Sequence, residues 1–178
     1  MNSINKNQPE DNYESLAGDA AVDKIKELAE KIDTCFFCTA ISQGVAVKTR
    51  PMTVQEVDEE GNLWFLSASD SHTNAEIQND SSVQLFFQGS SHSDFLTLYG
   101  KASVSTDKAR IEKYWKPLLK TWFTEGKDDP RITVIKVAAA SGYYWDNKHG
   151  NAVAFVKMVA GAVMGKTLDD SIEGKLTV

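Results

Sequence analysis

The spacing of hydrophobic and polar residues predicts one amphipathic helix followed by six strands. Over 20–32 the apolar residues recur at helical spacing, and Asp19 is a suitable N-cap residue. The apolar stripe of this helix comprises Val22, Ile25, Leu28 and Ile32. Short runs rich in β-branched and aromatic residues, bounded by turn residues, are typical of strands. Such runs occupy 34–41, 45–57, 62–68, 83–89, 94–105 and 132–145.

The remaining segments add only peripheral elements. A short helix is expected over 71–79, and a longer one over 106–123 that Pro117 interrupts. The pattern of 150–178 mixes small and apolar residues and predicts no element. Six strands with mostly hairpin connections predict a mainly β fold, an antiparallel β-barrel with peripheral helices. Closing the sheet would remove its exposed edges.

Length and composition indicate one globular domain without a nucleic-acid or membrane partner. The chain has 178 residues, of which 42% are hydrophobic and 25% charged. Its net charge of −6 argues against a general binder of nucleic acid or anionic membranes. It has neither a membrane-length apolar run nor a signal peptide, so a cytoplasmic location is expected. We expect a flexible arm (1–18), a domain (19–165) and a tail (166–178).

The two cysteines, Cys35 and Cys38 in "TCFFCTA", have the C-x-x-C spacing of redox and zinc motifs. However, the flanking residues predict a buried strand, on which residues three apart point to opposite faces. The two sulfurs should therefore diverge, and a second ligand pair for zinc is missing. We expect two reduced core thiols.

Other motifs for hydrolytic, nucleotide or metal chemistry are missing from the sequence. There is no Gly-rich phosphate loop of the Rossmann or P-loop type, and no "GxSxG" elbow. The three histidines, His72, His92 and His149, are far apart and lack metal-ligand spacing. We therefore expect no metal, and we name no catalytic residue.

Arg50 and Pro51 stand side by side inside a predicted strand. Alternation along the strand gives two faces, and the cleaner core face comprises Val45, Val47, Thr49 and Thr53. Arg50 then points outward, either as a solvated side chain or into a cleft between two subunits. In a cleft its guanidinium would bind a phosphate or a carbonyl-rich ring. Pro51 suits a bulge that leaves backbone groups available to a ligand.

The ordered set of segments resembles a known family. After the first helix come "CFFCTA", "RPM", "GNLWFLSA", "SHTNAEIQND", "VQLFF", "LYGKA", "DDP" and "YYWD". This order is similar to that of the pyridoxamine 5′-phosphate oxidase-like flavin-binding split barrels, in the branch of the bacterial general stress proteins. The resemblance covers about residues 20–165. It implies a six-stranded split β-barrel, a homodimer, and FMN in clefts at the dimer interface.

The resemblance also implies a set of cofactor-binding residues. The "RPM" segment and the end of strand 62–68 would line the flavin ring and ribityl chain. The start of the short helix would hold the phosphate, where the helix also offers free amides. A tryptophan from elsewhere in the dimer would close the cleft. The implied residues are Arg50, Pro51, Met52, Thr53, Leu66, Ser67, His72, Thr73, and Trp115 or Trp145.

The sequence departs from the family at the phosphate end. The family usually places a basic pair where this chain has His72 and Thr73. Each lost charge-assisted contact is worth roughly 1.5–3 kcal/mol, although Arg50 and the helix amides can compensate. True oxidases of the family also carry an arginine-rich C-terminal stretch, whereas this chain has no arginine after Arg131. A pyridoxamine phosphate oxidase is therefore not expected.

Three functions are consistent with these residues. The first is an FMN-dependent oxidoreductase acting on an unknown small molecule, in which the cofactor carries the hydride. The second is a flavin-binding module without turnover, as a reservoir or stress-related sensor. The third is a degenerate barrel that holds haem or a deazaflavin.

Overall fold

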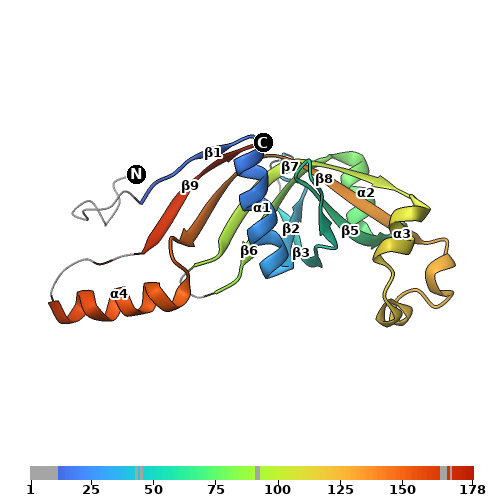
Figure 1. Ribbon diagram of the computed structural model, residues 1–178. Helices are drawn as coiled ribbons and strands as arrows, with labels where there is room; N and C mark the ends of the chain where they lie inside the picture. Colours follow the sequence, from blue (N-terminus) through green and yellow to red (C-terminus); the bar gives the residue numbers. More distant parts are fainter. Residues whose placement is uncertain (1–11, 43, 45, 91–92, 165–167, 169) are drawn as a thin grey trace.

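The computed structural model describes residues 12–42, 44, 46–90, 93–164, 168 and 170–178. One large sheet dominates it, and helices lie at the sheet's periphery (Figure 1). The strands are β1 (Leu16–Ala17), β2 (Thr34–Thr39), β3 (Lys48–Thr53), β4 (Glu56–Val57), β5 (Asn62–Ala68), β6 (Ser82–Gln88), β7 (Phe95–Ser105), β8 (Ile132–Asn147) and β9 (Ser171–Thr177). The α-helices are α1 (Asp19–Ile32), α2 (His72–Asn79), α3 (Lys108–Tyr114) and α4 (Asn151–Met164), with 3₁₀ turns η1 (Pro117–Thr121) and η2 (Gly126–Asp128).

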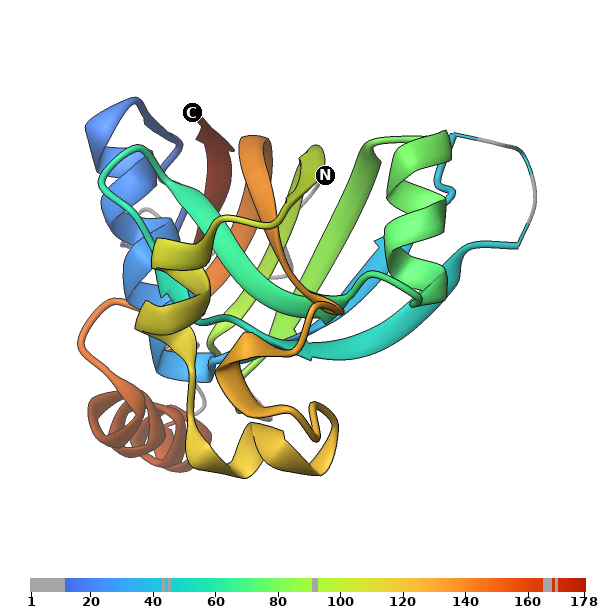
Figure 2. The same ribbon diagram turned by 90° about the vertical axis from the view of Figure 1, so that its right-hand side faces the viewer.

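The sheet branches at β8. Its main order is β1-β9-β8-β7-β6-β2-β3, and β5 pairs with both β8 and β4. With 16 residues, β8 is about 50 Å long. One edge of β8 pairs with β7. The other edge pairs with β5 along its first half and with β9 along its second half. All ladders are antiparallel except that between β1 and β9. The sheet is strongly curved, with α1 and α2 at opposite sides (Figure 2).

The predicted mainly β class is confirmed, whereas the six-stranded antiparallel split barrel is not. The six expected strands are present as β2, β3, β5, β6, β7 and β8. In the described part of the chain, however, β3 pairs only with β2, so the sheet remains open between β3 and β5. The ends of the chain supply β1 and β9, which the sequence pattern did not predict. With the two-residue strand β4, which lies within the expected strand 45–57, these additions give a mixed sheet of nine strands.

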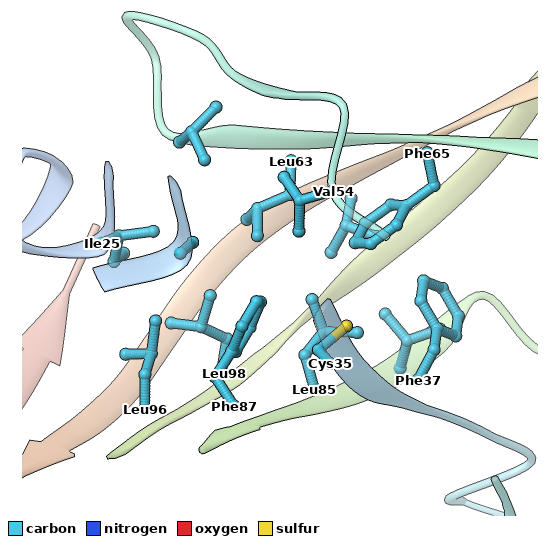
Figure 3. Close-up of a cluster of buried hydrophobic side chains, with 14 of the residues drawn as sticks. Ile25, Cys35, Phe37, Val54, Leu63, Phe65, Leu85, Phe87, Leu96 and Leu98 are labelled. Atoms are coloured by element: carbon cyan, nitrogen blue, oxygen red, sulfur yellow. The ribbon is translucent and has the colours of Figure 1, made fainter. Parts of the chain in front are cut away.

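The main core fills the space between α1 and the concave side of the sheet (Figure 3). Ile25 and Leu28 of α1 are fully buried there. Phe37 of β2 meets Phe65 of β5 edge to face, with ring centroids 5.3 Å apart. Burying a side chain of this size stabilises the fold by roughly 1.5–3 kcal/mol. This contact joins β5 to β2, the neighbour of the terminal strand β3.

The first helix begins one residue earlier than its predicted cap implies. Asp19 is its first residue, and Gly18 is the N-cap, with φ of 58°. Glycine suits this left-handed geometry, which a Cβ would strain. The buried stripe of α1 is also shifted, because Ala21 and Ala29 are buried in place of Val22 and Ile32. The predicted break at Pro117 is confirmed, since α3 ends before it and η1 begins at it.

The two cysteines are free and buried, as predicted. Cys35 belongs to the main core, where burial raises the pKa of its thiol to about 12. The Sγ of Cys38 instead lies 3.3 Å from Oγ1 of Thr49 on β3. The Cys35 thiol is therefore not set up as a reactive thiolate.

Part of the expected N-terminal arm lies along the expected C-terminal tail. Leu16 pairs with Leu176, and Tyr13 forms a bridge to Glu173. The division of the chain into arm, domain and tail stays a prediction.

Helix α4, between β8 and β9, is held by the buried Asp170, which accepts from Lys157 Nζ at 2.7 Å. Among the described helices, none is both long enough and apolar enough to cross a membrane.

Candidate functional site

A pocket of about 560 Å³ opens where β3 passes the start of α2. We call it the α2 pocket. Its lining combines two cations, two carboxylates, two hydroxyls and one imidazole. The lining residues are Lys48, Arg50, Asp70, Ser71, His72, Thr73 and Glu76.

Helix α2 is fixed at its N-terminus by hydroxyl groups. Ser71 is its N-cap, and its Oγ accepts a hydrogen bond from the Asn74 amide at 3.2 Å. The same Oγ lies 3.1 Å from Oγ of Ser67 at the end of β5. Asn74 donates from Nδ2 to Oγ1 of Thr133 on β8 at 2.9 Å. These bonds hold the positive end of the helix dipole at the pocket.

Arg50 faces α2, on the side of β3 opposite to that expected. The predicted core face comprises Val45, Val47, Thr49 and Thr53. Val47 is 49% exposed, the two threonines are also exposed, and Val45 lies outside the described residues. The prediction of this core face is wrong because β3 begins only at Lys48, after Val47, and the positions of the strand that face the core alternate with Thr49 and Thr53. Met52, two residues after Arg50, packs against the main core.

The Arg50 guanidinium makes three hydrogen bonds within the chain. Nη1 donates to Oγ1 of Thr73 at 2.8 Å, and Nη2 donates to Oγ1 of Thr39 at 3.2 Å. Nη2 also lies 2.6 Å from Oε2 of Glu76, as a charge-assisted bond. The Arg50 side chain is 23% exposed, so it is anchored rather than freely solvated. At least two of its five N–H groups remain for a ligand.

Glu76 is the anionic centre of the α2 pocket. Burial alone would raise the pKa of Glu76, but hydrogen bonds from Thr39, Arg50 and Lys48 together lower it to about 2. Oε1 of Glu76 lies 3.1 Å from Nζ of Lys48. A carboxyl with this pKa stays ionised at neutral pH and is poorly matched to general acid–base catalysis. Glu76 is therefore suited to hold cations and hydroxyl groups in place rather than to transfer a proton.

The hydrogen-bond donors of the pocket fit a phosphate group, although two carboxylates also line it. Arg50 and Lys48 supply a guanidinium and an ammonium, and Ser71 and Thr73 supply hydroxyls beside a helix N-terminus. The carboxylates of Asp70 and Glu76 offset these two positive charges. The set can hold a phosphate by hydrogen bonds, but it offers no net positive charge.

The structure brings only some of the predicted residues to this pocket. Arg50, His72 and Thr73 line it, and Ser67 contacts it through Ser71. The remaining predicted residues lie elsewhere in this chain. Pro51 and Thr53 are on the exposed side of β3. Met52 packs against the main core, Leu66 and Trp115 pack against the second apolar cluster, and Trp145 is on the outer sheet face.

The sequence analysis missed the pocket residues Lys48, Asp70, Ser71 and Glu76 and the Arg50 partner Thr39. Two of them leave a signal in the sequence. Lys48 stands two residues before Arg50, which puts both on one face of a strand. Glu76 stands three residues after Thr73, which puts both on one face of a helix. Their meeting depends on how α2 packs on the sheet, which no local pattern encodes.

A second, apolar pocket of about 280 Å³ lies on the outer face of the sheet. We call it the aromatic pocket; its lining includes Phe36, Phe86, Phe95 and Trp145. Phe36 and Phe86 face each other on neighbouring strands and are 57% and 44% exposed. Trp145 packs on Tyr143, with ring centroids 4.5 Å apart. Exposed aromatic patches of this kind are typical of binding surfaces.

Comparison with known proteins agrees with this architecture. The protein bli-3 of Neurospora crassa is 25% identical over 93% of this chain and 86% of its own length. A crystal structure assigned as general stress protein 26 from Jannaschia sp. CCS1 superposes with a TM-score of 0.71 at 21% identity, covering 90% of this chain and all of that one. The general stress FMN/FAD binding protein of Xanthomonas citri gives a TM-score of 0.56 at 23% identity, covering 67% and 82%.

The family model that matches is described as pyridoxamine 5′-phosphate oxidase like, and it matches residues 20–169. This match spans most of the chain and confirms the resemblance found in the sequence. The chain belongs to the pyridoxamine 5′-phosphate oxidase-like family.

Proposed function

We propose that the protein binds FMN, with the phosphate in the α2 pocket and the ring extending along β3. The observation that carries this proposal is the meeting of Arg50, Lys48 and the start of α2 in one pocket. Family membership supports a flavin as the ligand, and the Xanthomonas citri neighbour is itself named as an FMN/FAD binding protein. In this chain Arg50 would donate charge-assisted hydrogen bonds to the phosphate, and the Ser71 and Thr73 hydroxyls would orient it.

The binding unit we propose is a homodimer of split barrels. Support comes from the outer sheet face, where Phe36, Phe86 and Trp145 are exposed around the aromatic pocket. A second copy covering this face would bury the aromatic side chains and supply further walls for the flavin ring. In that arrangement Trp145 or Trp115 would contact the ring from the partner chain.

We further propose that the protein is an FMN-dependent oxidoreductase. When bound, the flavin supplies the hydride chemistry, and the protein supplies binding, orientation and exclusion of water. A flavin-binding module without turnover is the second candidate. Glu76 favours it, because the low pKa of this carboxyl makes it a poor proton donor near pH 7. For either candidate we place the protein in the cytoplasm.

An absorption spectrum between about 350 and 500 nm tests the proposal, since bound flavins absorb there. The purified protein is titrated with FMN, riboflavin and FAD, and then with NADH or NADPH under anaerobic conditions. A saturable flavin complex supports flavin binding, and its bleaching with turnover supports the oxidoreductase. A complex that does not bleach favours the module. If no flavin binds while haem or a deazaflavin does, the proposal is overturned.

A further inference from the structure

Glu76 already faces both cations of the α2 pocket. Its Oε2 accepts from Arg50 Nη2 at 2.6 Å, and its Oε1 lies 3.1 Å from Lys48 Nζ. Thr39 adds a third bond, donating from Oγ1 to Oε2 at 2.6 Å. The Glu76 side chain is 13% exposed and that of Arg50 is 23% exposed, so their contact is partly enclosed, whereas the Lys48 side chain is 60% exposed and its contact is screened by water. An anionic ligand therefore meets cations that an internal anion has already paired.

The charges lining the pocket cancel. Lys48 and Arg50 contribute two positive charges, and Asp70 and Glu76 contribute two negative ones. Asp70 contributes less than Glu76 to the electrostatic field in the pocket, because its side chain is 63% exposed and its carboxylate lies 3.9 Å from Arg131. A phosphate monoester carries about −1.5 to −2 charges at pH 7. Its entry would therefore place a second anion beside Glu76.

A neutral ligand end meets no such opposition. A sugar-like hydroxyl can donate to the Glu76 carboxylate or accept from the remaining Arg50 N–H groups. It would gain these bonds without separating Arg50 from Glu76. The lining of the pocket thus offers hydrogen-bond partners to the hydroxyl end of riboflavin as well as to the phosphate end of FMN.

We propose that Glu76 competes with the ligand phosphate for Arg50, so that this site binds FMN little more tightly than riboflavin. This inference rests on the proposed flavin-binding function. Within it, Glu76 determines ligand specificity through charge. Arg50 remains the group that contacts the ligand.

The test compares dissociation constants for FMN and riboflavin, measured by quenching of flavin fluorescence on the full chain. For the unmodified protein the two constants should agree within about threefold. In Glu76→Gln the carboxylate loses its charge but keeps its shape, and the preference for FMN should rise about tenfold or more. The matched control is Glu112→Gln on α3, which removes an exposed charge paired with Lys127 and should leave the preference unchanged.

The measured dissociation constants distinguish a failure of this inference from a failure of the proposed flavin-binding function. A preference of about a hundredfold for FMN in the unmodified protein would overturn the inference, even if Glu76→Gln fails to fold. An unchanged or reduced preference in a folded Glu76→Gln protein would also overturn it, because Glu76 would then only position Arg50. If neither protein binds any flavin, the proposed function itself fails.

Discussion

The guanidinium Nη2 of Arg50 lies 2.6 Å from the carboxylate Oε2 of Glu76, across the gap between β3 and α2. This ion pair joins a strand and a helix that are distant in sequence. It holds the arginine at the pocket in a fixed orientation. A neutral substitution at one partner would leave the charge of the other unpaired.

Replacing Arg50 with alanine should weaken FMN binding about tenfold or more, because the phosphate loses a charge-assisted contact. Arg110→Ala and Arg131→Ala are the controls. Arg110 is bound to Tyr114 over Trp64, and Arg131 is paired with Asp129, so neither lines the α2 pocket. Fluorescence titration of the three variants measures the effect, and equal losses in all three would remove Arg50 from the site.

Replacing His72 with arginine should tighten FMN binding about tenfold, because His72 is exposed and lines the α2 pocket. The control is Gln78→Arg, which adds the same charge to an exposed position of α2 outside the pocket lining. The affinity for FMN is compared between the two variants. If Gln78→Arg tightens binding as much as His72→Arg, the effect is general electrostatics and His72 does not face the phosphate.

The neighbouring substitution Thr73→Lys should destabilise the protein without tightening FMN binding. Thr73 is buried and accepts a hydrogen bond from Nη1 of Arg50. A lysine there would place a partly desolvated cation beside the guanidinium. We expect a lower midpoint of thermal unfolding and no gain in affinity. Tighter FMN binding in Thr73→Lys, with an unchanged midpoint, would show that this position faces the ligand.

Introducing a charge on the outer sheet face should dissociate the proposed dimer. Phe86→Glu puts a carboxylate at the centre of the exposed aromatic residues. The control is Leu118→Glu, at a position on η1 that is 74% exposed and away from this face. Light scattering after size exclusion should give a monomer mass for Phe86→Glu and a dimer mass for the control. A dimer in both would exclude this face as the interface.

The contribution of Glu76 to stability should depend on pH. The folded protein lowers the pKa of Glu76 from 4.5 to about 2, so the unfolded state binds the proton more readily. The stabilisation is therefore present above about pH 4.5 and is lost as the pH falls towards about 2. The difference in urea midpoint between the unmodified protein and Glu76→Gln should shrink over this range. A difference that does not change with pH would contradict the ion pair.

Much of the fold could be predicted from local patterns, whereas the site could be predicted only in part. Alternation and turn residues located six strands and three helices, because those signals are local. The end of the chain gave no such signal, since β9 has Gly174 and polar residues and depends on pairing with β8. Arg50 was singled out because arginine is unusual inside a strand. Its partners Thr39 and Glu76 come from other elements, so only the packing of α2 on the sheet reveals them.

The most direct test of the central claim is a crystal structure of the protein with FMN. The account predicts the phosphate within hydrogen-bonding distance of the Arg50 guanidinium at the start of α2, with the flavin ring between two copies of the chain. A flavin bound elsewhere, with Arg50 still paired only to Glu76, Thr39 and Thr73, would contradict it.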